Sequence, residues 1–281
     1  MRLRLFLLPT VCCALAAVGA CNEGVRISST RTEDDSGKGV LKVIDALQCP
    51  QTVGSLTRKG SASAGGTVCT YVGPKGAEVS LHLVRLDGAP PADVLKTFED
   101  RLSTALPRAV SALNAAAAEA EAGAMEAERA SAAGSGDHAS VRAPGVAIEA
   151  AGDEATVRLP GMRIETRGDK ASVRIGGFHI DADDSDGSAR VSGSSPAGDN
   201  VSINAQDDAA EIRASAGGGG TRASWILTDS RASESGWRVV GYEARGPVGG
   251  PLVVATVRSR DRNRERAFED AKDLVALNAG R

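Results

Sequence analysis

Residues 139–149 read ASVRAPGVAIE, residues 155–165 read ATVRLPGMRIE and residues 171–181 read ASVRIGGFHID, so one pattern recurs at an offset of 16 residues. Apolar and polar residues alternate within each copy, and a Pro-Gly or Gly-Gly pair divides the copy in the middle. Alternation of this kind is typical of β-strands, and such pairs are typical of turns. The segment therefore predicts two short strands in each repeat, and degenerate copies continue to about residue 212.

A unit of this length is too short to bury its own apolar face, so neighbouring units must stack. A parallel β-solenoid would place Val141, Val157 and Val173 in one internal ladder and Ile148, Ile164 and Ile180 in another. An antiparallel meander of the same strands is the alternative. Identical residues at identical offsets favour the solenoid, so the expected fold class is mainly β with α: a repetitive β-solenoid flanked by small α+β hairpin-and-helix segments.

The Gly-Asp turns at residues 152–153 and 168–169, each followed by alternating Val-x-Ile or Val-x-Leu strands, give the repeat a family resemblance. Residues 137 to 215 resemble the adhesin-like β-solenoids of bacterial envelope proteins, a group classed as a domain of unknown function. The resemblance implies a surface or scaffold role and brings no catalytic residues with it.

The repeats, placed at 137–230, are preceded by two expected segments. Residues 40–114 read as a small α+β domain, with a helix or a buried strand over 40–47 and a hairpin of strands 67–72 and 77–86. A helix opens at Pro91 and carries apolar residues at spacings of three and four as far as Leu113, with a kink expected at Pro107. Residues 115–136, rich in Ala and Glu, predict a helical spacer.

Residues 231–281 predict a second hairpin, turned at 246–250, and a helix over 263–278 with Phe268, Ala271, Leu274 and Val275 on one side. This hairpin and helix match those of the 40–114 segment in size. The sequence leaves open whether the two segments pack together.

The N-terminus predicts export. Arg2 and Arg4 precede an apolar run over residues 5–18 that is shorter than the roughly 20 residues needed to span a bilayer, which is typical of a signal peptide. The tetrapeptide Val18-Gly19-Ala20-Cys21 resembles the lipobox of bacterial lipoproteins. We therefore expect a signal peptide over 1–20, palmitate-type lipid on Cys21, a flexible tether over 21–39 and a membrane-anchored protein facing the periplasm. Free secretion after ordinary cleavage is the alternative.

Cysteine usage agrees with lipidation. Cys12 and Cys13 leave with the signal peptide and lipid occupies Cys21, so Cys49 and Cys69 remain as an even pair in an oxidising compartment. These two are expected to form a disulfide. A redox or metal pair is the alternative, but their spacing does not match Cys-x-x-Cys chemistry and no histidine lies near them in the sequence.

Charge argues against nucleic acid as a partner. Loss of the signal peptide removes two basic residues and no acidic one, leaving 31 basic and 36 acidic residues and a net charge of −5. Nucleic-acid binding requires a concentrated basic surface. An envelope polymer or an envelope protein is the expected partner.

Candidate binding residues fall within the repeats. Arg142, Arg158 and Arg174 would form a column about 4.8 Å apart in a parallel stack, where they could bind an anionic polymer or be neutralised by an acidic ladder of Glu149, Glu165 and Asp181. The acidic stretch of Asp181, Asp183, Asp184 and Asp186 reads as a solvated loop, with weak Ca²⁺ binding as the alternative. No other metal site is expected.

Catalytic signatures are not evident in the sequence. It has no Gly-x-Ser-x-Gly, His-Glu-x-x-His, P-loop or Ser-x-x-Lys motif, and His82, His138 and His179 are scattered, with His82 and His179 expected to face solvent. A methyl-transferring or nucleotide-using enzyme would need alternating strands and helices, which the middle of the chain lacks. The sequence thus predicts a non-catalytic lipoprotein without a cofactor, acting in binding, adhesion or scaffolding; the alternative is an enzyme acting on envelope material.

Overall fold

The computed structural model describes residues 40–131, 138–143, 146–151, 154–159, 162–167, 170–175, 178–183, 188–195, 198–206, 208–261 and 265–280. Helices α1 (Pro91–Ser103), α2 (Pro107–Ser131) and α3 (Glu265–Ala279) accompany sixteen strands. The strands before the repeats are β1 (Thr52–Val53), β2 (Leu56–Ser63), β3 (Val68–Val72) and β4 (Glu78–Val84). Those of the repeat region are β5 (His138–Ala143), β6 (Val146–Ala151), β7 (Glu154–Leu159), β8 (Met162–Arg167), β9 (Lys170–Ile175), β10 (Phe178–Asp183), β11 (Ser188–Ser194), β12 (Asn200–Gln206) and β13 (Ala209–Ala216). The last three are β14 (Gly220–Asp229), β15 (Val239–Pro247) and β16 (Leu252–Ser259).

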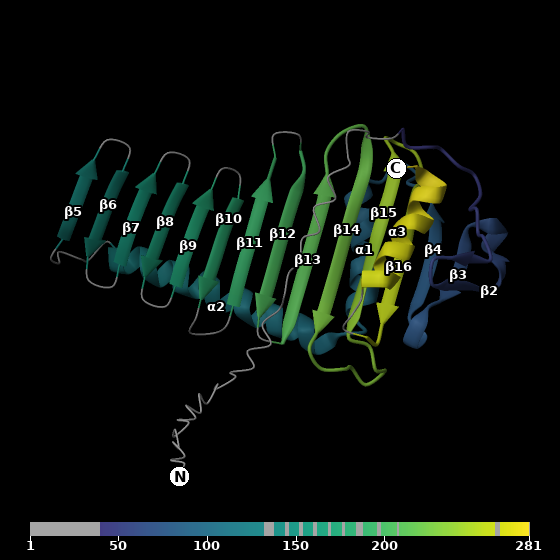
Figure 1. The fold of residues 1–281 in the computed structure, drawn as a ribbon, viewed down its shortest axis with the longest axis horizontal. Helices are drawn as coiled ribbons and strands as arrows, with labels where there is room; N and C mark the ends of the chain where they lie inside the picture. The colour runs from purple at the N-terminus through teal and green to yellow at the C-terminus, as the bar shows by residue number, and fades with distance from the viewer. Residues whose placement is uncertain are drawn as a thin grey trace, which may run out of the picture. The chain divides into compact units, whose positions relative to one another are not determined.

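All of these strands belong to one antiparallel sheet, in the order β1-β2-β3-β4-β16-β15-β14 and then down to β5 (Figure 1). The N-terminal and C-terminal hairpins meet where β4 pairs with β16, for example at Val79 and Val257. The repeats extend this sheet strand by strand from β13 to β5. The strands expected before, within and after the repeats therefore belong to a single sheet. The 40–114 and 231–281 segments pack together through the pairing of β4 with β16.

The parallel solenoid is not confirmed; the strands follow the meander alternative. Val157 pairs with Ile148 on one side and with Ile164 on the other, so β6 separates Val157 from Val141. The two ladders expected of a solenoid merge into one row of register partners: Val141, Ile148, Val157, Ile164, Val173, Ile180, Val191, Ile203, Ile212 and Ile226. Each repeat is thus a hairpin that adds two strands to the sheet.

Helices cover the two faces of the sheet at different places. Helix α3 lies against β15, β16 and β4 (Figure 1). Its Phe268, Leu274 and Val275 share one buried core with Val79 and Val257. Helices α1 and α2 lie on the opposite face, where a second core gathers around Phe98, Leu106, Trp225, Leu227, Tyr242 and Val254. The strands around β15 therefore have a hydrophobic core on each face of the sheet.

Several local expectations are corrected. Residues 40–47 form neither helix nor strand and lie beside the end of α3, with the Lys42 amide donating to the Ala279 carbonyl. Pro107 does not kink one helix but begins α2, because Thr104, Ala105 and Leu106 form a turn after α1. Strand β2 lies between the expected segments 40–47 and 67–72, in a Gly- and Ser-rich stretch that the sequence indicated as a loop.

Cys49 and Cys69 are joined by the expected disulfide, with their Cα atoms 6.3 Å apart. The bridge ties the segment before β1 to β3 beside the α3 core. Among the helices that the structure describes, none has the length and apolar character needed to cross a membrane.

Candidate functional site

The candidate site is a groove of about 740 Å³ between α1 and the strands β11 to β15. Hydroxyl and amide side chains line its strand wall, namely Ser192, Ser194, Asn200, Ser202 and Ser215. The helix wall carries Asp93, Lys96 and Glu99. We call it the α1 groove. Its lining combines these hydrogen-bonding groups with apolar residues such as Leu95 and Val201.

The floor of the α1 groove is built from three cross-strand neighbours. Arg213 on β13 pairs with Trp225 on β14, which pairs with Tyr242 on β15. The rings of Trp225 and Tyr242 are stacked with their centroids 6.1 Å apart, and the two residues are only 2% and 3% exposed. Such aromatic pairs stabilise a sheet beyond the area they bury. The floor is therefore closely packed.

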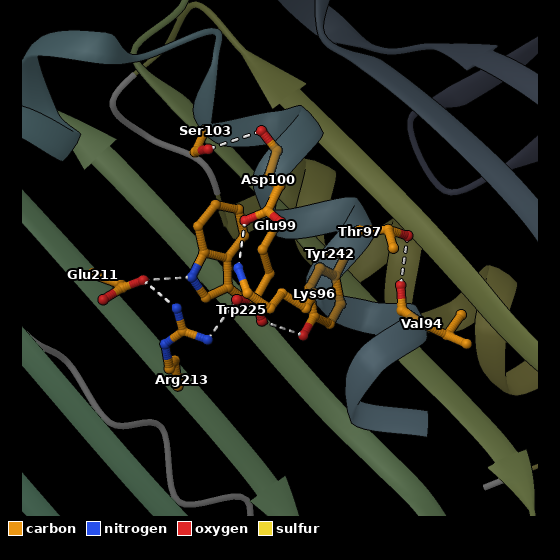
Figure 2. Close-up of polar contacts among 10 residues, drawn as sticks. All are labelled: Val94, Lys96, Thr97, Glu99, Asp100, Ser103, Glu211, Arg213, Trp225 and Tyr242. Atoms are coloured by element: carbon orange, nitrogen blue, oxygen red, sulfur yellow. Dashed lines mark hydrogen bonds and ion pairs between the residues drawn. The ribbon is translucent and has the colours of Figure 1, made fainter. Parts of the chain in front are cut away.

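Helix α1 brings Glu99 onto this floor, because Leu95, Phe98 and Leu102 anchor the helix in the core one turn away. Glu99 accepts a hydrogen bond of 2.8 Å from the Tyr242 hydroxyl on one carboxylate oxygen and an ion pair of 2.5 Å from Arg213 on the other (Figure 2). The side chain of Glu99 is 14% exposed. Both of its oxygens are thus occupied by protein donors.

Glu211 completes the network from the strand side. Its Oε1 accepts a hydrogen bond of 2.8 Å from Trp225 Nε1 and another of 2.7 Å from Arg213 (Figure 2). The Arg213 guanidinium therefore bridges the carboxylates of Glu99 and Glu211. Charge-assisted bonds of this kind are stronger than neutral ones. The network of Glu99, Glu211, Arg213, Trp225 and Tyr242 fixes α1 against β13, β14 and β15.

Burial and the adjacent Glu99 carboxylate raise the pKa of Tyr242 well above its ordinary value. The phenol therefore stays protonated and acts as a hydrogen-bond donor. Burial alone would lower the pKa of Arg213, but hydrogen bonds and charge from Glu99 and Glu211 raise it. These groups suit positioning rather than proton transfer, since a general acid or base needs a pKa near the working pH.

The arginine column expected from the sequence takes another form. The antiparallel register makes Arg158, Arg163 and Arg174 successive cross-strand partners, with His179 next in the row. The side chain of Arg142 lies outside the described residues. Arg163 also pairs with Glu165 on its own strand. Arg142, Arg158 and Arg174 come from every second strand, so the spacing on which polymer binding was predicted does not hold.

The predicted lipidation site and the candidate Ca²⁺ ligands are not tested by the structure. Cys21 lies outside the described residues, as do the side chains of Asp181, Asp183, Asp184 and Asp186. Among the described residues, no group of three or more His, Cys, Asp or Glu side chains is placed to hold a metal ion.

The histidine expectations are partly corrected. His82 was expected to face solvent; instead its ring meets Phe98 of α1 edge-on at 5.5 Å, and burial and Arg101 lower its pKa. His179 shares a hydrogen bond of 2.9 Å with Ser172. The side chain of His138 is not among those described.

Sequence reasoning missed the whole network of the α1 groove. Its members come from residues 99, 211, 213, 225 and 242, and no motif links positions so far apart. One signal was present: Glu211 and Arg213 flank Ile212 on one strand, so the alternation itself places both charged side chains on the same face. Comparison with known protein families, with curated proteins and with solved structures finds no match for this chain.

Proposed function

We propose that this chain is an exported, non-catalytic lipoprotein of the bacterial cell envelope, anchored to a membrane by lipid on Cys21 and acting as a binding or scaffold protein. The leader, the Val18-Gly19-Ala20-Cys21 tetrapeptide and the even cysteine pair support export and anchoring. The surface role rests on the likeness of the repeat sequence to adhesin-like envelope repeats and not on their solenoid fold, because these strands form a meander.

The observation that carries the binding role is the α1 groove. On its floor Glu99 and Arg213 are paired with each other, Lys96 pairs with Asp100 beside the groove, and the strand wall is rich in hydroxyl and amide groups. A preorganised wall of this chemistry favours a ligand that is itself rich in hydroxyl and amide groups, because such a ligand can replace the water bound there without burying a charge. The proposed ligand is an uncharged stretch of envelope glycan.

Lipidation is tested by metabolic labelling with a palmitate analogue in a bacterium that processes lipoproteins. The wild-type chain should carry the label and Cys21→Ser should not. A wild-type chain without label, or label that survives Cys21→Ser, contradicts anchoring at this residue.

Groove binding is tested by co-sedimentation of the folded protein with purified peptidoglycan sacculi. Ser215→Tyr would fill the α1 groove from the exposed end of β13, whereas Ser61→Tyr would add the same ring to exposed β2, away from the groove. We expect Ser215→Tyr to weaken sedimentation about tenfold and Ser61→Tyr to leave it unchanged. Equal sedimentation of all three proteins, or none by the wild type, contradicts the proposed glycan site.

A further inference from the structure

The face of β5–β13 opposite α2 has no role in the function proposed above. Strand alternation puts the Val and Ile row on this face and the polar residues on the other, where Arg190 donates to the Ala116 carbonyl of α2. Six members of the row have described side chains in the repeats, and all are partly exposed: Val157, Ile164, Val173, Val191, Ile203 and Ile212. We call this surface the Val/Ile face.

The Val/Ile face continues the core beneath α3. The same row of register partners passes from Ile212 to Ile226, Gly241, Val257 and Val79, and the last two are fully buried by α3. In the part of the chain that the structure describes, no helix lies over this face of β5–β13 (Figure 1). This apolar surface is buried by α3 at one end and exposed at the other. Exposed apolar surfaces of this size mark interaction sites, so we expect another layer to cover it.

The chemistry of the Val/Ile face excludes several occupants. The flanking positions on the described strands of this face are small or apolar, for example Ala155, Ala171, Ala189, Val201 and Ala205. A charged polymer would find no partner among these residues. The segment over 22–39 is polar, with few apolar residues, and does not match the face either.

A second copy of the chain matches it in chemistry and area. Strands about 4.8 Å apart that rise about 3.3 Å per residue give the nine strands β5–β13 roughly 850 Å², close to the ~800 Å² per partner of a stable interface. Side chains on the apolar inner faces of two packed sheets interdigitate to form a core, and the Val/Ile face is apolar in this way. We propose that two copies pack their Val/Ile faces together as a twofold-symmetric sandwich.

The position of α3 selects the symmetry axis. Helix α3 occupies the layer over β15, β16 and β4, so a partner sheet must end before it reaches these strands. An axis parallel to the strands at β9 satisfies this, because it lays the partner's β5 over β13 and keeps each α3 beyond the partner's edge. Val173 on β9 then lies beside the axis, and Val157 on β7 faces the partner's Val191 on β11. This inference does not depend on the α1 groove or on the lipid.

The test is cysteine crosslinking of the full-length chain in intact cells with a short bismaleimide reagent. Val173→Cys should give a dimer band, and Ser172→Cys, on the opposite face of β9, should give none. Adding Val191→Asp to Val173→Cys should reduce the band at least tenfold, and adding Val157→Lys as well should restore it, which distinguishes interface loss from misfolding.

Two outcomes would overturn the dimer. One is an equal band with Ser172→Cys. The other is the absence of a dimer band with Val173→Cys; if this cysteine is then also protected from a water-soluble maleimide, the Val/Ile face is covered by lipid or by another envelope protein.

Discussion

The hydroxyl of Tyr242 on β15 donates a hydrogen bond of 2.8 Å to Glu99 on α1, joining residues 143 apart in the sequence. Both residues line the α1 groove. The contact also orients the carboxylate that holds Arg213.

Tyr242→Phe should lower the free energy of unfolding by about 1–2 kcal/mol, because the partly buried Glu99 loses a donor that water cannot fully replace. Urea denaturation followed by fluorescence measures the change. Asp100→Asn is the matched control: it breaks an exposed pair with Lys96 on the same helix and should change stability by less than about 0.5 kcal/mol. Equal losses in the two variants would mean that the Tyr242 contact adds nothing specific.

Glu243 gives the structure a pH dependence. Its residue is 7% exposed on β15, and burial raises its pKa although Arg245 and Lys272 oppose the shift. The native state therefore holds this proton to higher pH than the unfolded chain does, so the contribution of Glu243 to stability is greatest below its ordinary pKa and is lost as the pH rises through its native pKa.

Glu243→Gln should remove that dependence. The unfolding free energy of the wild type minus that of the variant should fall as the pH rises from 4 to 7, by at most about 1.4 kcal/mol per pH unit. Parallel urea titrations across this range measure it. A difference that stays constant with pH, or grows as the pH rises, would contradict a raised pKa.

Gly241 interrupts the row of β-branched residues between Ile226 and Val257 for a steric reason. A Cβ at this position would lie 2.2 Å from the Trp225 carbonyl oxygen and 2.9 Å from the ring of Phe268. Gly241→Ala should therefore cost about 1–3 kcal/mol by crowding α3 against the sheet. Gly219→Ala, with nothing within 4 Å, should be close to neutral in the same thermal melts. A neutral Gly241→Ala would show that α3 does not pack there.

The disulfide can be tested by mass and by stability. Peptide mapping without reduction should recover the fragments containing Cys49 and Cys69 as one linked species. The double variant Cys49→Ser, Cys69→Ser should be less stable by about 3 kcal/mol, because its unfolded chain loses a loop constraint of 20 residues. Two free thiols in protein from the periplasm would contradict the bridge.

The strands of the repeats could be predicted from the sequence, whereas their topology could not. Alternation and turn residues locate β5–β10 because both signals are local. The same alternation satisfies a parallel stack and an antiparallel meander, and a 16-residue offset fits a unit of two strands in either. The pairing of Val157 with Ile148 and Ile164 distinguishes the two topologies. This pairing is a relation between strands, and the sequence of the repeat does not encode it in a recognisable pattern.

The α1 groove was beyond prediction for a related reason. Glu99 and Arg213 meet across 114 residues, and their pairing requires β4 to join β16 so that α1 lies over β13–β15. By contrast, the face of α3 followed directly from the spacing of Phe268, Ala271, Leu274 and Val275, all of which are buried. Helical periodicity can be predicted because it depends on residues close in sequence. The partner of a charged side chain on a strand can lie far away in the sequence, so it cannot be predicted in this way.

The central structural claim is that the repeats continue the sheet as an antiparallel meander, and paired cysteines test it most directly. Neighbouring strands place register partners about 5 Å apart, within reach of a disulfide, whereas residues two strands apart lie about 9.6 Å from each other, beyond that reach. Val157→Cys with Ile164→Cys should therefore form an intramolecular disulfide, seen as a linked peptide pair by mass spectrometry, and Val141→Cys with Val157→Cys should not. A linked pair in the second variant and free thiols in the first would contradict the meander and restore the parallel solenoid.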